Sequence, residues 1–165
     1  MIVLGIDPGT AITGYGVVRG GAVPSLIECG VIRTSAGAPL PARLRDIFDG
    51  VSDLIQRHGP DVLAVEDVFY SRNVRTTLVL GHARGVVLLA GERAGIGVSE
   101  YSPALIKKTV VGRGAATKEQ VQFMVARLLR LKSAPKPADA ADGVACALTY
   151  VMSAGLAQLR ARAGA

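Results

Sequence analysis

The sequence predicts a single α/β domain built on a five-stranded mixed sheet that is flanked by helices. Residues 1–6 form an uninterrupted apolar run, which is typical of a central strand covered on both faces. Two further short strand-like segments follow closely, and after them segments of helical and strand spacing alternate. With 165 residues, 50% of them hydrophobic, the chain is long and apolar enough to bury a core in one domain.

The first half of the chain predicts a strand meander and a helix. Strands are expected at Gly14–Arg19 and Leu26–Arg33, and their short connections favour antiparallel pairing with the first strand. Apolar residues at helical spacing then predict an amphipathic helix over 41–57, which ends at Gly59-Pro60.

The second half continues with a buried strand at Asp61–Glu66 and then alternates between helix and strand. A helix is expected over 74–94, a fifth strand at Ile96–Tyr101 and a short helix over 103–110. This alternation after the meander is what makes the predicted sheet mixed.

The C-terminal segment predicts two more helices. Thr117-Lys-Glu-Gln120 is a capping-box signature that starts a helix, and the prolines within 133–137 break it. A last helix is expected from near Asp139 to about 153. The domain is therefore placed at 1–157, and the basic tail 158–165 is predicted to be flexible.

The composition favours a partner with negative charge. The formal net charge is +6 and the pI is about 9.7, which suits nucleic acid, although an arginine-rich proteome would give the same balance. Cys29 and Cys146 lack metal-binding spacing and are expected to be small buried residues in a reducing compartment. No signal peptide is recognisable, and the longest apolar stretch, 85–91, is too short for a membrane span, so a soluble cytoplasmic protein is expected.

Four of the 13 acidic residues fall at the ends of predicted elements. Asp7 ends the first strand, Glu66 ends the fourth, and Asp139 and Asp142 begin the last helix on one face. If the first and fourth strands are neighbours, Asp7 and Glu66 lie close together. The alternatives are structural, since Asp139 and Asp142 could cap a helix and Asp-Pro-Gly could be an ordinary turn.

Clustered carboxylates predict a site for hard divalent cations. Like charges at short distance repel unless they are protonated or bridged by cations. Oxygen ligands suit Mg²⁺ or Mn²⁺ rather than zinc. Two such ions per site could activate water and stabilise the leaving oxygen in phosphodiester cleavage.

Four stretches of the chain together resemble the RuvC family of Holliday-junction resolvases. They are GIDPGTAITGYGVV at 5–18, AVEDVF at 64–69, IKKTVVGRGAATKEQVQ at 106–122 and DAADGVACA at 139–147. The resemblance implies a ribonuclease-H-like fold and a homodimer that nicks two strands of like polarity at a four-way DNA junction. It also implies Mg²⁺ or Mn²⁺ as cofactor, with two ions expected per active site when DNA is bound, and the RuvA–RuvB branch-migration complex as partner. The family's catalytic, metal-binding acids correspond to Asp7, Glu66, Asp139 and Asp142.

The same resemblance assigns residues to DNA. Lys107 and Lys118 match catalytic basic residues of the family, and Phe69 matches an aromatic that stacks on bases. Tyr70 is expected to assist Phe69, unless either ring fills the core or the dimer interface. Charge and position add Lys108 and Arg113. The expected DNA-binding residues are therefore Phe69, Tyr70, Lys107, Lys108, Arg113 and Lys118. The alternative for the lysines is a solvated helix surface.

The dimer interface is expected on the predicted helix 74–94. Gly81 and Gly85 lie four residues apart there and could allow close helix packing.

Three other functions are weaker alternatives, since the chain length, the basic segment 106–122 and the presence of all four acids favour the junction enzyme. An actin-like or sugar-kinase ATPase shares the strand and Asp-x-Gly-Thr turn but needs two such domains. A nuclease that processes ribosomal RNA precursors would share the fold and acids. A non-catalytic protein could hold junction DNA while a partner cuts it.

Overall fold

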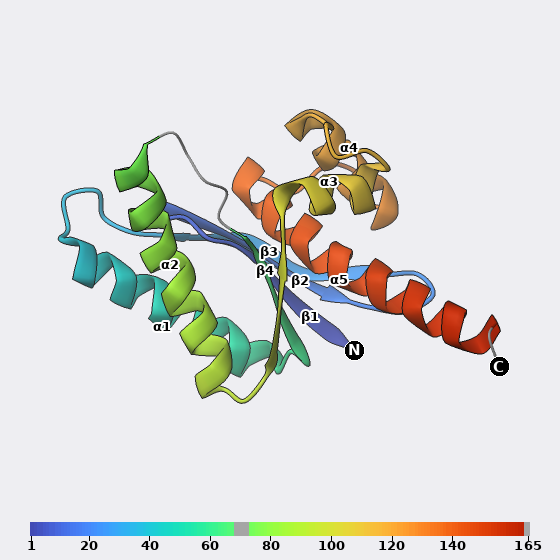
Figure 1. Ribbon diagram of the computed structural model, residues 1–165, viewed down its shortest axis with the longest axis horizontal. Coiled ribbons are helices and arrows are strands. Elements are labelled where there is room, and N and C mark those ends of the chain that lie inside the picture. Colours follow the sequence, from blue (N-terminus) through green and yellow to red (C-terminus); the bar gives the residue numbers. More distant parts are fainter. Residues whose placement is uncertain (68–72, 164–165) are drawn as a thin grey trace.

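The computed structural model describes residues 1–67 and 73–163, which form a five-stranded sheet with helices on both faces (Figure 1). The strand order is β3-β2-β1-β4-β5. The strands are β1 (Ile2–Asp7), β2 (Ile12–Arg19), β3 (Ser25–Arg33), β4 (Val62–Glu66) and β5 (Gly97–Tyr101). The predicted α/β class and mixed sheet are confirmed.

The pairing of the strands confirms the predicted antiparallel meander and shows that the first and fourth strands are neighbours. β2 pairs antiparallel with β1 and with β3, which gives the meander, whereas β4 lies parallel to β1 and β5 parallel to β4. Ile6 lies opposite Val65. The next residue on each strand is acidic, so the register brings Asp7 and Glu66 to the same edge of the sheet.

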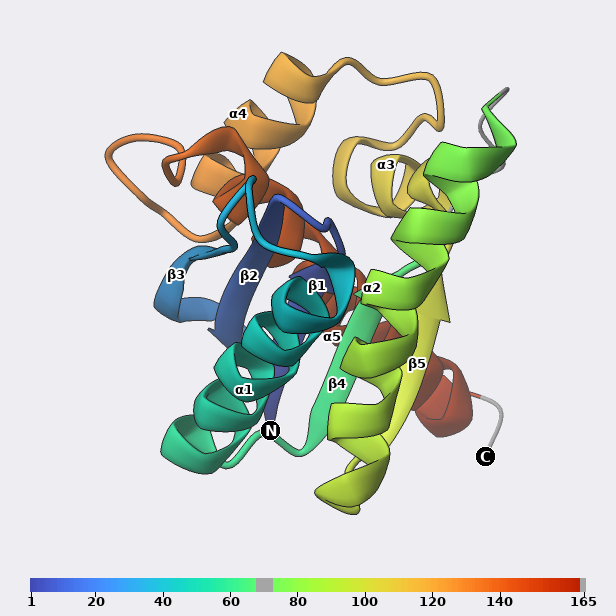
Figure 2. The same ribbon diagram turned by 90° about the vertical axis from the view of Figure 1, so that its left-hand side faces the viewer.

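Two helical layers cover the sheet. α1 (Leu40–His58) and α2 (Val74–Arg93) lie on one face, and α5 (Ala138–Ala163) lies on the other with α3 (Pro103–Val111) and α4 (Lys118–Leu128) beside it (Figures 1 and 2). Each face has its own aliphatic core, and side chains of β1 alternate between them. Leu4 and Ile6 pack toward α1 and α2, whereas Val3 packs toward α5.

Glycines on the sheet allow α5 to lie directly on β1 and β2. A Cβ atom at Gly14 would overlap the carbonyl oxygen of Asp139, and one at Gly16 would lie 2.6 Å from Val144 Cα. A Cβ at Gly5 would lie 2.8 Å from Ala147 Cβ. The side-chain-free surface therefore sets the distance between helix and sheet, and with it the position of the first turn of α5.

One detail differs from the sequence prediction. The last helix continues to Ala163 rather than ending near 153, because Ala, Leu, Gln and Arg all favour helix and the lone Gly155 does not end it. Gly81 and Gly85 do not pack against another element of the described chain; both are exposed and have open space around their Cα atoms. None of the helices in the described ranges combines the length and apolar character that spanning a membrane requires.

Candidate active site

Asp7 and Glu66 reach the same side of the sheet because side chains alternate along a strand. Asp7 follows Val3 and Gly5 on the face that α5 covers, and Glu66 follows Ala64 on that same face. Asp67 is exposed and pairs with Arg84 of α2, at 3.4 Å from Nε to Oδ1. The side chain of Asp67 therefore lies on the opposite face of the sheet from that of Glu66.

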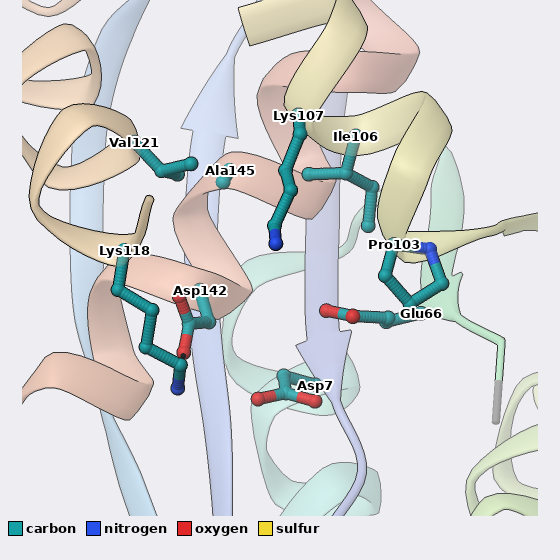
Figure 3. A pocket seen from close by; sticks show the side chains of 9 residues that line it. All are labelled: Asp7, Glu66, Pro103, Ile106, Lys107, Lys118, Val121, Asp142 and Ala145. Atoms are coloured by element: carbon teal, nitrogen blue, oxygen red, sulfur yellow. Dashed lines mark hydrogen bonds and ion pairs between the residues drawn. The ribbon is translucent and has the colours of Figure 1, made fainter. Parts of the chain in front are cut away.

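The first two turns of α5 bring two more acids to the same place. Asp7, Asp139 and Asp142 each offer a carboxylate oxygen, and these oxygens lie within 4.8 Å of one another. Glu66 lies across from Asp142 and points toward the same space (Figure 3). The cavity has a volume of about 300 Å³ and is lined by Asp7, Glu66, Pro103, Ile106, Lys107, Lys118, Val121, Asp142 and Ala145.

The carboxylates of this cavity hold more negative charge than their surroundings compensate. Burial raises the pKa of Asp7 to about 7, with further contributions from the charges of Asp142 and Asp139. Burial also raises the pKa of Glu66 to about 8, reinforced by the charges of Asp7 and Asp142. Such shifts mark a place where a bound cation would stabilise the ionised form of every group.

Two lysines enter the cavity from different helices. Lys118, at the start of α4, places its Nζ 3.0 Å from Oδ2 of Asp142. This contact raises the pKa of Lys118, so the ammonium is charged. Lys107 extends from α3 into the space between Asp142 and Glu66 (Figure 3). The charge of each lysine opposes the rise in the pKa of Glu66.

The turn after Asp7 is held by a residue that the sequence analysis did not single out. Thr13 is fully buried, and its hydroxyl donates to the carbonyl of Gly9 at 2.7 Å and accepts from the Gly9 N–H at 3.4 Å. These bonds close the loop between β1 and β2 that follows Asp7. The signal was the second threonine of GTAITG, a buried hydroxyl that needs a partner.

Comparison with known proteins agrees with this geometry. The family model described as crossover junction endodeoxyribonuclease RuvC matches residues 3–150. The chain belongs to the RuvC family. A RuvC of Desulforamulus reducens is 49% identical over 153 residues, which cover 91% of this chain and 93% of that protein.

Solved structures of RuvC proteins share the fold over nearly the whole chain. The Thermus thermophilus RuvC structure superimposes with a TM-score of 0.87 at 38% identity, covering 95% of this chain and 97% of that one. T. thermophilus RuvC in complex with a Holliday junction substrate gives 0.86 at 35% identity, covering 94% and 96%. The predicted ribonuclease-H-like fold and the resemblance to the RuvC family are thereby confirmed.

Lys108 and Arg113, which charge and position assigned to DNA, do not line the cavity. Lys108 is exposed on α3. Arg113, in the loop after α3, donates to Oε1 of Gln120 at 3.0 Å. Gln120 also accepts from the N–H of Thr117, which completes the predicted capping box of α4. Phe69 and Tyr70 fall outside the described residues.

Proposed function

We propose that this RuvC-family chain resolves Holliday junctions by paired, metal-dependent nicking of two strands of like polarity. The observation that carries the proposal is a cavity that Asp7, Glu66 and Asp142 line together with two lysines. Asp139 adds a fourth acid, with a carboxylate oxygen within 4.8 Å of those of Asp7 and Asp142. A nuclease needs such a combination, because cations must hold the phosphate and stabilise charge as the P–O bond breaks.

The residues that would hold Mg²⁺ or Mn²⁺ are Asp7, Glu66, Asp139 and Asp142. The donor set fits these ions, since it consists of carboxylate oxygens. Burial, reinforced by the charges of neighbouring carboxylates, raises the pKa of Asp7 and of Glu66, and a bound cation would offset both effects. Asp7 has a carboxylate oxygen within 4.8 Å of those of Asp139 and Asp142, and its charge acts on Glu66, so the four acids would together hold two ions. When bound, such ions supply an activated water and stabilise the leaving oxygen.

The chain's own cations would position the DNA. Lys107 points into the cavity and Lys118 lies at its rim, so both can donate to phosphate oxygens next to the scissile bond. Lys108 and Arg113 lie on the adjoining surface of α3 and the loop after it, where they would contact the backbone farther along the strand. Phe69 and Tyr70 would stack on bases near the crossover, a role that the family resemblance suggests.

A homodimer would supply the second cut. A four-way junction has approximate two-fold symmetry, which a two-fold dimer matches with two equivalent sites. α2 supports this role, because Val74, Leu78 and Leu89 are 71%, 60% and 49% exposed on the described chain. Together with Gly81 and Gly85 they follow helical spacing and form an apolar stripe along one face. We also propose the RuvA–RuvB branch-migration complex as a partner, because the chain belongs to the RuvC family.

The test is cleavage of a synthetic four-way junction beside a linear duplex and an RNA–DNA hybrid, with Mg²⁺, Mn²⁺ or EDTA. We expect symmetric paired nicks on the junction alone, abolished by EDTA and reduced about 10³-fold or more by Asp7→Asn, which keeps junction binding. Cutting of the RNA-containing substrate, or wild-type cleavage by Asp7→Asn, would overturn the proposal. Sedimentation of the junction complex should give two chains per junction, and a monomer would refute the two-site mechanism.

A further inference from the structure

We propose that Lys118 is a built-in counter-ion of the active site, which weakens metal binding until a DNA phosphate draws its ammonium away. Metal and DNA would then bind cooperatively. The inference rests on the proposed function, since it names how the same site is regulated.

The geometry of Lys118 places it in competition with a metal ion. Its Nζ lies 3.0 Å from Oδ2 of Asp142, and Asp142 belongs to the group of three acids whose oxygens lie within 4.8 Å of one another. An ammonium and a divalent ion both seek these carboxylate oxygens. The positive charge of Lys118 also acts on Asp7. The lysine therefore supplies part of the charge that a metal ion would otherwise supply.

The two partners of the ion pair differ in their freedom to move. The side chain of Asp142 is 14% exposed and is fixed on the part of α5 that packs against the sheet, whereas that of Lys118 is 64% exposed. The backbone of Lys118 is held by the capping box of Thr117 and Gln120 directly beside it. The ammonium can thus leave Asp142 by rotation of its flexible stem while helix and sheet stay in place.

A DNA phosphate offers Lys118 an alternative partner at the mouth of the cavity. When the ammonium turns to phosphate, Asp142 regains an uncompensated charge and a free oxygen. Because coupling between two ligands is reciprocal, DNA then raises the affinity for metal and metal raises the affinity for DNA by the same factor.

Lys107 provides a matched control. It lines the same cavity and carries the same charge, but no ion pair holds it to an acid among the residues that the structure describes. Lys107→Met and Lys118→Met remove equal charge, so a general electrostatic effect would be similar in both variants. A specific counter-ion effect would appear only in Lys118→Met.

The first experiment measures Mn²⁺ binding to the DNA-free protein by calorimetry and by the electron paramagnetic resonance signal of free Mn²⁺. We expect Lys118→Met to bind Mn²⁺ about tenfold more tightly than wild type, Lys107→Met to change the affinity less than threefold, and Lys118→Arg to restore the weak binding. Circular dichroism checks that each variant is folded. Equal tightening in both methionine variants, or no tightening in Lys118→Met, would overturn the inference.

The second experiment measures the coupling to DNA. Junction affinity is followed by fluorescence anisotropy over a Ca²⁺ series, and a denaturing gel confirms that the junction stays intact. We expect Ca²⁺ to strengthen junction binding severalfold more in wild type than in Lys118→Met. Equal strengthening in both proteins would refute the exchange. Neither readout requires cleavage, so failure here is distinguishable from failure of the proposed nuclease activity.

Discussion

Half-buried acids lie at two places on the same sheet, and their pKa values are shifted in opposite directions. In the active site, the pKa of Asp7 is raised to about 7 and that of Glu66 to about 8. At Glu28 on the edge strand β3, the pKa is lowered to about 2. Glu28 is an ionised acid whose charge is balanced by its partners, whereas Asp7 and Glu66 lie where too little positive charge surrounds them.

The cause lies in the hydrogen-bond partners. Arg57 donates to both oxygens of Glu28, at 3.0 and 3.2 Å, and these bonds lower the pKa most. Tyr15 donates its hydroxyl at 2.8 Å, and Nε2 of His58 lies 2.9 Å away. Glu28 therefore joins β2, β3 and α1, and its charge is fully compensated. In the candidate active site, by contrast, burial and neighbouring carboxylates raise the pKa of Asp7 and Glu66.

The largest expected effect comes from separating α5 from the sheet with Gly14→Ala. The new methyl group would overlap the Asp139 carbonyl, so the first turn of α5 must shift and carry Asp139 and Asp142 away from Asp7. We expect cleavage to fall about 100-fold and the free energy of unfolding to fall by roughly 2 kcal/mol. Junction cleavage assays and urea denaturation measure the two effects.

Gly97→Ala is the control for that substitution. Gly97 begins β5, and a Cβ there would meet no atom within 4 Å. A loss of cleavage in Gly97→Ala as large as in Gly14→Ala would show that the close approach of α5 is not the cause.

The second effect concerns pH and metal together. Asp7 and Glu66 have folded-state pKa values above their unfolded values, so the folded protein keeps protons that the unfolded chain has lost between about pH 4 and 8. Metal-free stability should therefore fall by several kcal/mol as the pH rises through this window, and level off above it. Urea denaturation in EDTA at pH 5 and pH 8 measures the change.

Asp7→Asn and Mg²⁺ sharpen the same measurement. Asp7→Asn should flatten the pH dependence, because it removes one titrating group and a charge that raises the pKa of the other. Mg²⁺ should stabilise wild type at pH 8 more than Asp7→Asn, since the ion binds the folded, ionised site. An Asp7→Asn protein as pH-dependent as wild type would contradict the origin assigned to the effect.

The sequence predicted the two groups of acids unequally well. Asp7, Glu66, Asp139 and Asp142 each stand at the end of an apolar element, where a charge needs a reason, so their meeting could be predicted once β1 and β4 were taken as neighbours. The alternation of strand side chains then fixed which face they share.

Other features could not be read from the sequence. The Lys118–Asp142 ion pair joins residues 24 positions apart, and its existence depends on how α4 docks against α5. The Glu28 network likewise depends on how α1 packs against β3. Nothing in the sequence around Arg57 and His58 marks them as partners of Glu28. The glycines of β2 were visible, but only the packed helix shows that their missing side chains set the position of the acids.

The smallest expected effect concerns Glu28, the acid whose charge is balanced by its partners. Glu28→Gln keeps the shape of the side chain but removes the charge that pairs with Arg57 and accepts from Tyr15. We expect the free energy of unfolding to fall by about 1 kcal/mol at pH 7, a modest value because the group is partly exposed. The stability that Glu28 contributes changes with pH in the opposite direction to that of Asp7 and Glu66. A lowered folded-state pKa gives stability that is complete above about pH 4.5 and is lost as the pH falls toward 2, so the difference between Glu28→Gln and wild type should shrink at pH 3. Urea denaturation at pH 7 and pH 3 measures it, and junction cleavage at pH 7 should be unchanged. A Glu28→Gln protein that folds normally yet cleaves far more slowly would show that the two groups of acids are coupled through the sheet rather than independent.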